Sequence, residues 1–162
     1  MPFTANKWVR DWQLQAVATI ESGRPFTVAV HPDIDASNTG RSNLGFGYND
    51  RPNVTGDPSL SESDRSETRW FDTSAFSMPA FGTFGNSGRN TLDGPGSKSL
   101  NLAVIKLIPL AGVRLQGRFE VFNLFNTANL DLPDAFFGSP TFGQILSAQA
   151  PRRIQVGVRV LF

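Results

Sequence analysis

The sequence has no cysteine and few charged residues, and it has no long apolar run. Without cysteine there are no disulfides, no thiolate metal sites and no cysteine nucleophile. The charged fraction is 18%, below the quarter usual for globular chains. The 15 basic and 14 acidic residues nearly cancel, which gives no general attraction to nucleic acid. No apolar run approaches the ~18 residues of a membrane-spanning helix.

Residues 1–4 carry neither a basic nor an apolar leader segment, so we expect no signal peptide at this position. A chain bound for the cell envelope should have one. We therefore expect either a cytoplasmic domain or a fragment whose true start lies upstream, and the strand pattern favours the fragment. Glycine (15), proline (11) and phenylalanine (14) are plentiful, a mixture that suits short strands and many turns.

The clearest pattern lies at residues 154–162, where apolar side chains occupy every second position up to the terminal Phe162. A period of two predicts a strand with one apolar face. Similar runs predict strands at 113–123, at 98–108 and within 11–30, the last as one kinked strand or as a strand plus a short extension. Alternation breaks at Lys106, which indicates a bulge or the end of a membrane zone.

The connections between these strands are very unequal. A tight turn is predicted at 109–112. By pattern, the stretch at 31–97 is a long structureless loop rich in glycine and proline, and the one at 124–153 is a loop of moderate length. Long loops on one side and short turns on the other are typical of outer-membrane barrels, and runs of about nine to eleven residues fit a tilted membrane-spanning strand. Aromatic residues near the strand ends fit interfacial girdles; these are Trp8, Trp12, Phe122, Phe125 and Phe162.

The polar faces of the predicted strands supply the candidate functional residues. In a barrel they would face the lumen, where they could pair with a plug, line a substrate path, or simply be hydrated. The candidates are Arg114, Arg118, Glu120, Gln155 and Arg159.

Other motifs give weaker signals. His31, the single histidine, lacks a nucleophile-elbow sequence, so we expect no catalytic triad and no enzyme. Asp33, Asp35 and Ser37 begin with calcium-loop spacing, but Asn38 and Leu44 replace the required glycine and carboxylate. The glycines at 82, 85 and 88 indicate tight turns with Phe81 and Phe84 packed between them. We expect no cofactor.

The sequence resembles the carboxy-terminal barrel region of TonB-dependent outer-membrane receptors, most closely the Oar-like group, whose members often carry a carboxypeptidase-regulatory-like domain. The resemblance runs over nearly the whole chain in the family's order. It rests on WQL (12–14), SGRPF (22–26), RPN (51–53), GDP (56–58), WFDTSAF (70–76), GTFGNSGRN (82–90), GPG (94–96), RFEVFNLFN (118–126), FGQI (142–145), PRRIQ (151–155) and the terminal Phe162.

This resemblance implies a Gram-negative outer-membrane barrel of about 22 strands, filled by a plug and energised through TonB to import a scarce, bulky nutrient. Residues 1–162 would be the last four or so strands, without the plug and without the segment that contacts TonB. The implied partners are outer-membrane lipid, the remaining barrel strands, the plug, TonB, and the barrel-assembly machinery that reads Phe162. Such a piece would not transport alone.

Two alternatives remain open from the sequence. In a soluble β-sandwich binding module the apolar faces would meet each other in a closed core. An outer-membrane lipase would depend on His31, so an active His31→Ala variant would exclude it.

Overall fold

The computed structural model describes residues 10–40 and 49–162, and these divide into two compact units. The sheet unit consists of residues 10–21, 97–129 and 150–162. The loop unit consists of residues 22–40, 49–96 and 130–149.

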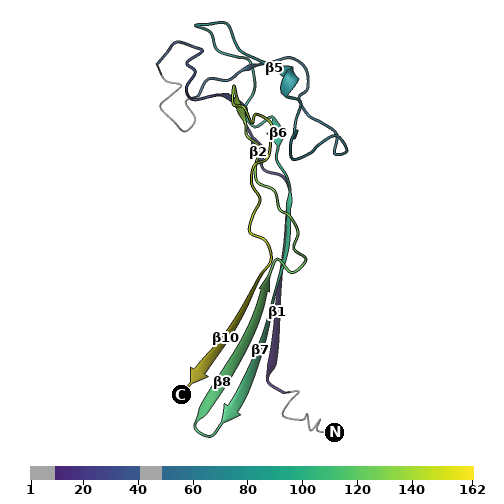
Figure 1. Cartoon of the computed structure of the whole chain (residues 1–162), viewed down its shortest axis with the longest axis vertical. Helices are drawn as coiled ribbons and strands as arrows, with labels where there is room; N and C mark the ends of the chain where they lie inside the picture. The colour runs from purple at the N-terminus through teal and green to yellow at the C-terminus, as the bar shows by residue number, and fades with distance from the viewer. Residues whose placement is uncertain (1–9, 41–48) are drawn as a thin grey trace. The chain divides into compact units, whose positions relative to one another are not determined.

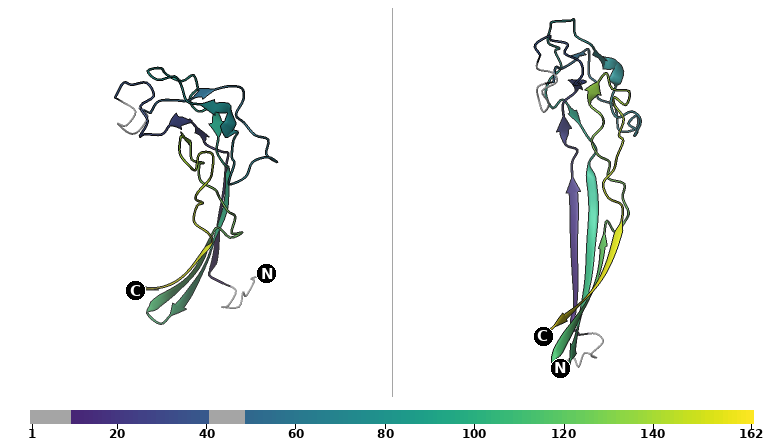
Figure 2. Two further views of the ribbon diagram at one scale, coloured as in Figure 1. Left: turned by 45° about the horizontal axis from the view of Figure 1, so that its top comes forward. Right: turned by 60° about the vertical axis from the view of Figure 1, so that its left-hand side comes forward.

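The sheet unit contains the four long strands of the chain. They are β1 (Trp12–Glu21), β7 (Ser97–Leu110), β8 (Val113–Phe122) and β10 (Arg153–Leu161). Their order is β1-β7-β8-β10, and every neighbouring pair is antiparallel. They lie side by side in one curved sheet (Figures 1 and 2). The prediction of an all-β fold is confirmed, and so is antiparallel pairing for the four long strands.

The hairpin between β7 and β8 is tighter than predicted. Pro109 and Leu110 pair with Arg114 and Val113, which leaves only residues 111–112 in the turn. Gly112 supplies the turn's positive φ of 81°. The predicted turn at 109–112 was too long because proline is tolerated near the end of a strand.

No bulge occurs at Lys106. The register is continuous from Trp12↔Lys106 to Glu21↔Ser97 on one side of β7, and from Leu102↔Val121 to Leu110↔Val113 on the other. The bulge alternative is therefore wrong, and Lys106 stays on the apolar side of an unbroken strand.

The long stretch at 31–97 is not structureless, which corrects the sequence prediction. With residues 22–30 and 130–149, its described part forms the loop unit, built on short strand pairs. Antiparallel pairs join β2 (Pro25–Phe26) to β6 (Leu92–Asp93) and β4 (Asn53–Val54) to β5 (Phe76–Ser77), and β3 (Ala29–Val30) pairs in parallel with β9 (Phe136–Phe137). A single 3₁₀ turn, η1, spans Thr73–Ala75. Residues 11–30 are thus β1 followed by segments that pair elsewhere.

Aromatic rings make the core of the loop unit. Phe71 is fully buried and packs at tilted or edge-to-face angles against three other rings. Its centroid lies 5.8 Å from Phe26, 5.8 Å from Phe76 and 5.2 Å from Phe142. Such geometry adds to the burial energy of each ring. The WFDTSAF and FGQI blocks, distant in sequence, therefore meet in one core.

Carboxylates organise the turns of the loop unit. Asp134 accepts hydrogen bonds from the hydroxyls of Ser139 and Thr141, both at 2.6 Å, and from the backbone N–H of Phe136 at 2.9 Å. Burial opposes ionisation of Asp134, but these hydrogen bonds outweigh it and lower its pKa. At η1, hydrogen bonds from the Ser74 hydroxyl and backbone N–H lower the pKa of Asp72, the N-cap residue.

Candidate functional site: the two faces of the sheet

Strand register sorts the side chains of the sheet onto two chemically different faces. Paired residues of antiparallel strands point to the same side. One side, the apolar face, is almost wholly hydrophobic. It consists of Trp12, Leu14, Ala16, Ala18 and Ile20 from β1; Lys98, Leu100, Leu102, Val104, Lys106, Ile108 and Leu110 from β7; Val113, Leu115, Gly117, Phe119 and Val121 from β8; and Ile154, Val156, Val158 and Val160 from β10.

The apolar face is not covered by another layer. Val156 and Val158 are 72% and 74% exposed, and Leu14 and Ile20 are similarly open. A β-sandwich would bury these side chains against a second sheet, so the soluble-module alternative fails. Large exposed apolar surface of this kind marks contact with lipid or protein.

The ends of the apolar face follow a slanted line. Trp12 is in register with Lys106, Gly117 and Val158 on the three following strands. The aromatic residue at the corresponding end of the last strand is Phe162, which directly follows β10 and lies four residues beyond Val158 (162 − 158). Four residues across three strand spacings correspond to a slant of roughly 45° at ~3.4 Å per residue and ~4.8 Å per strand. Membrane barrels tilt their strands by about 35–45°.

The opposite end of the face has the same slant. Ile154 on β10 is in register with Val121, Leu102 and Ala16, and the last apolar residue of β1 is Ile20, again four residues away (20 − 16). At both ends the apolar run of β10 is therefore displaced by four residues from that of β1, and this staggered region is here called the apolar belt. On the two middle strands apolar residues continue beyond its hairpin-side edge, to Leu110 and Val113.

The predicted polar set lies together on the opposite side, here called the polar face. Arg118 and Glu120 form an ion pair of 2.7 Å, and Gln155 is in register with Glu120. Arg159 is in register with Gln116, and Arg114 lies one row nearer the hairpin, opposite Leu161. All five candidates thus share one face, and their position toward a lumen stays a prediction.

Lys106 is the exception within the apolar belt, and its charge is not isolated. Its ammonium group donates to the Arg10 carbonyl and lies 5.1 Å from the centroid of the Trp12 ring. The long stem reaches toward the edge of the belt, as lysines do at apolar boundaries.

An asparagine-rich turn, residues 123–129, forms hydrogen bonds with the backbone at the end of the sheet opposite the hairpin. Asn123 has a positive φ of 54°, and its amide exchanges hydrogen bonds with the Thr127 backbone at 2.9 and 3.0 Å. The side chains of Asn126 and Asn129 accept from the backbone N–H groups of Arg152 and Lys98. Sequence reasoning missed this turn, although the NLFN spacing of the 118–126 block is its signal.

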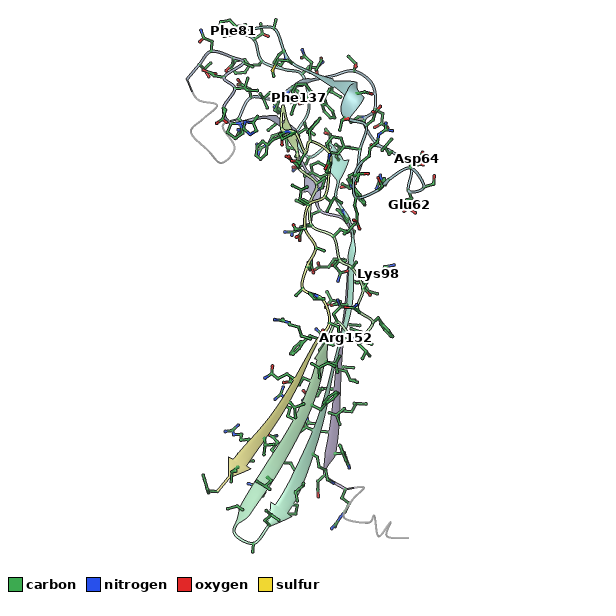
Figure 3. The ribbon with its side chains drawn as sticks, viewed as in Figure 1. Glu62, Asp64, Phe81, Lys98, Phe137 and Arg152 are labelled. Atoms are coloured by element: carbon green, nitrogen blue, oxygen red, sulfur yellow. The ribbon has the colours of Figure 1, made fainter. Side chains whose placement is uncertain are left out.

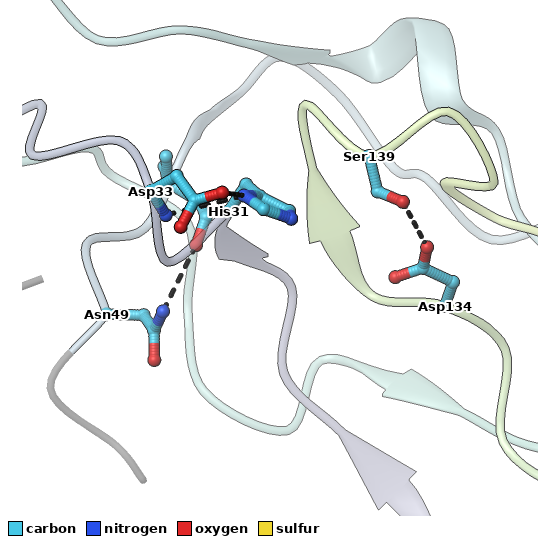
Figure 4. Close-up of polar contacts among 6 residues, drawn as sticks. His31, Asp33, Asn49, Asp134 and Ser139 are labelled. Atoms are coloured by element: carbon cyan, nitrogen blue, oxygen red, sulfur yellow. Dashed lines mark hydrogen bonds and ion pairs between the residues drawn. The ribbon is translucent and has the colours of Figure 1, made fainter. Parts of the chain in front are cut away.

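The weaker motifs resolve into loop contacts. His31 accepts a hydrogen bond from the Asp33 backbone and lies 3.5 Å from its carboxylate, while Ser139 donates to Asp134 (Figure 4). A hydroxyl bonded to His31 is not found in the described part of the chain. Asp35 uses its oxygens to accept from the backbone N–H groups of Thr39 and Gly40. No cluster of three metal-ligating side chains occurs within residues 10–40 and 49–162.

The prediction that Phe81 and Phe84 pack between glycine turns is wrong. Gly82 does form a turn with φ of 76°, but the two rings are 77% and 73% exposed. Trp8 and Leu44 lie outside the described residues. Where the structure is described, no helix has the length and hydrophobicity to span a bilayer.

A membrane-length antiparallel sheet with one apolar and one polar face defines the class of integral β-barrel proteins of outer membranes. Comparison with known families agrees: residues 2–155 match the model of an outer membrane beta barrel domain, and the chain belongs to that family. No curated protein and no solved structure matches the chain. The protein is therefore an outer-membrane protein, as predicted.

Proposed function

We propose that residues 1–162 are the carboxy-terminal part of the barrel of a TonB-dependent receptor of the Oar-like group, which takes up a scarce, bulky nutrient. The supporting observation is the placement of the connections. The two-residue hairpin turn lies at one end of the sheet, whereas residues 22–96 and 123–152 both leave the other end. In receptors of this class long loops face outward and gather substrate.

The chain would not act alone in this proposal. Within the described residues β1 and β10 each have one strand partner, and an unpaired edge is not tolerated in hydrocarbon. The remaining barrel strands would pair with these edges, and a plug domain would occupy the polar face. TonB would supply energy through the plug. We expect no enzymatic activity and no cofactor.

The test is genetic. An in-frame deletion of residues 1–162 and, separately, inactivation of TonB should abolish uptake of the same nutrient from a panel of iron chelates, cobalamin, oligosaccharides and peptides. Uptake that needs this chain but survives loss of TonB would point to a passive channel and contradict the proposal.

A further inference from the structure

His31 lies at a junction between the two long connections of the sheet. It directly follows β3, and its backbone N–H donates to the carbonyl of Phe137 on β9 (Figure 3) at 2.9 Å. Its ring centroid lies 6.3 Å from that of Phe136, with the two planes at 75°. Because β3 belongs to the connection between β1 and β7, and β9 to that between β8 and β10, their pairing joins the two connections.

The Nδ1 atom of His31 faces two groups of Asp33 that require opposite protonation states. The Asp33 backbone N–H donates to Nδ1 at 3.3 Å, which requires an unprotonated nitrogen. The Asp33 carboxylate lies 3.5 Å from the same nitrogen and can accept only from its protonated form (Figure 4). The His31 side chain is 35% exposed, so protons from solution reach it. Protonation of Nδ1 therefore exchanges the first contact for the second.

Two carboxylates attract a protonated imidazole at this position. Asp33 comes from its own turn, and Asp134 from the segment that leads into β9. Burial opposes ionisation of Asp134, whereas its hydrogen bonds and, least of all, a positive imidazole favour ionisation, and its pKa is lowered. Neither carboxylate pairs with lysine or arginine in the described part of the chain. The neighbouring carboxylates of Asp35 and Asp50 accept from backbone N–H groups of residues 37–40.

We propose that His31 is a pH-sensitive latch whose protonation strengthens the pairing of β3 with β9. A charge-assisted hydrogen bond is roughly twice as strong as a neutral one, so the Asp33 carboxylate holds the charged ring more firmly than the Asp33 N–H holds the neutral ring. The attraction of Asp134 then acts from the β9 side, across the pairing. The latch involves the loop unit alone and does not depend on the proposed uptake function.

The direction of the pH effect follows from which form gains the contacts. Histidine ordinarily changes charge between about pH 5 and 8. The protonated ring gains both carboxylates, so the added stability is present on the acid side of this range. It is lost as the pH rises through the range. The effect lies well above the acid range of Asp134, whose carboxylate stays ionised throughout.

Hydrogen exchange of the intact protein in detergent measures the latch. Rates at about pH 5.5 and about pH 7.5 are divided by the intrinsic rates of an unfolded peptide at the same pH. Peptides that cover residues 29–31 and 136–138 should then exchange about two- to fivefold more slowly at the lower pH, the range expected of a partly exposed ion pair. Equal protection at both values, or faster exchange in acid, would overturn the proposal.

His31→Gln should abolish the difference between the two pH values, because glutamine can accept from the Asp33 N–H but cannot gain charge. Asp33→Asn and Asp134→Asn should each reduce it. The matched control is Asp131→Asn, which removes a carboxylate of the same segment that is bonded to Ser147, and it should leave the difference intact. A difference that persists in His31→Gln, or in both aspartate variants, would assign the effect to another group. If His31→Gln does not assemble, Asp33→Asn, at an exposed side chain, provides the same test.

Discussion

Val158 and Arg159 are neighbours in sequence but lie on opposite faces of β10. Val158 is in register with Gly117, near the middle of the apolar belt, and Arg159 is in register with Gln116 on the polar face. Val158→Arg should cost about 2–4 kcal/mol, because it places a charge near the centre of the hydrocarbon. Arg159→Ala should cost far less.

The measurement is urea-induced unfolding of the intact protein from lipid vesicles, followed by tryptophan fluorescence. Both variants change a single side chain on the same strand. Equal losses of unfolding free energy would show that the two faces are not chemically distinct, and the assignment of the apolar belt to lipid would fall.

Gly85 illustrates a different residue-scale constraint, set by backbone packing in the loop unit. A Cβ atom at this position would overlap the carbonyl oxygen of Arg51 and the carbonyl group of Pro52. Gly85→Ala should therefore cost at least about 1–3 kcal/mol, as overpacking does, and speed proteolysis of the loop unit. Gly157→Ala is the control, because a Cβ there meets no atom within 4 Å. Comparable sensitivity of both variants to protease would refute the packing argument.

At the scale of elements, the turn after β8 depends on Asn123. Replacing it with alanine removes two side-chain hydrogen bonds and forces a Cβ residue to keep a φ of 54°. We expect Asn123→Ala to cost about 1–3 kcal/mol. Asn123→Gly should cost roughly 1 kcal/mol less, because glycine adopts this φ freely. Urea unfolding in vesicles compares the two, and a glycine variant as unstable as the alanine variant would exclude a backbone contribution.

The turns around Asp134 should respond to acid. The folded-state pKa of Asp134 lies below its ordinary value of 3.8, so its carboxylate stabilises the folded unit above that pH. This contribution is lost as the pH falls below 3.8 through the folded-state pKa. Hydrogen exchange of residues 130–149 should therefore quicken in that window. Asp134→Asn should exchange faster at neutral pH and show a weaker acid response. An identical acid response in the variant would assign the effect to other carboxylates.

Strand periodicity predicted the long strands well, because successive side chains of each strand alternate between an apolar and a more polar face of the sheet. The runs at 98–108, 113–123 and 154–162 correspond to β7, β8 and β10 with ends shifted by a few residues. Arg118 and Glu120 were placed on one face for the same reason, since alternation alone decides it. The hairpin end of β7 extends beyond the predicted run because Pro109 does not interrupt pairing and lies opposite Arg114.

The loop unit was not predictable in this way. Its strand pairs are two residues long, too short for any period to appear. Its core joins Phe26, Phe71 and Phe142, whose contacts depend on a fold that no local pattern encodes. Local pattern also failed for Phe81 and Phe84. The spacing of the neighbouring glycines predicted that these two rings are packed between turns, but both are exposed.

For the whole molecule, the terminal Phe162 offers a test of assembly. Its side chain is fully exposed at the end of β10. If the barrel-assembly machinery reads this aromatic, Phe162→Ala should lower the amount of assembled protein in outer membranes several-fold, whereas Phe162→Tyr should preserve it. Heat-modifiable migration in gels measures the assembled fraction. Normal assembly of the alanine variant would show that the barrel-assembly machinery does not depend on Phe162.

The strand order β1-β7-β8-β10 also restricts the number of strands that can close a ring with this sheet. Every neighbouring pair is antiparallel, so the two outermost strands of this set of four run in opposite directions. An alternating ring can join such a pair of edges only through an even number of added strands, whatever its circumference. One extra or one missing strand would bring two like-directed edges together at the seam.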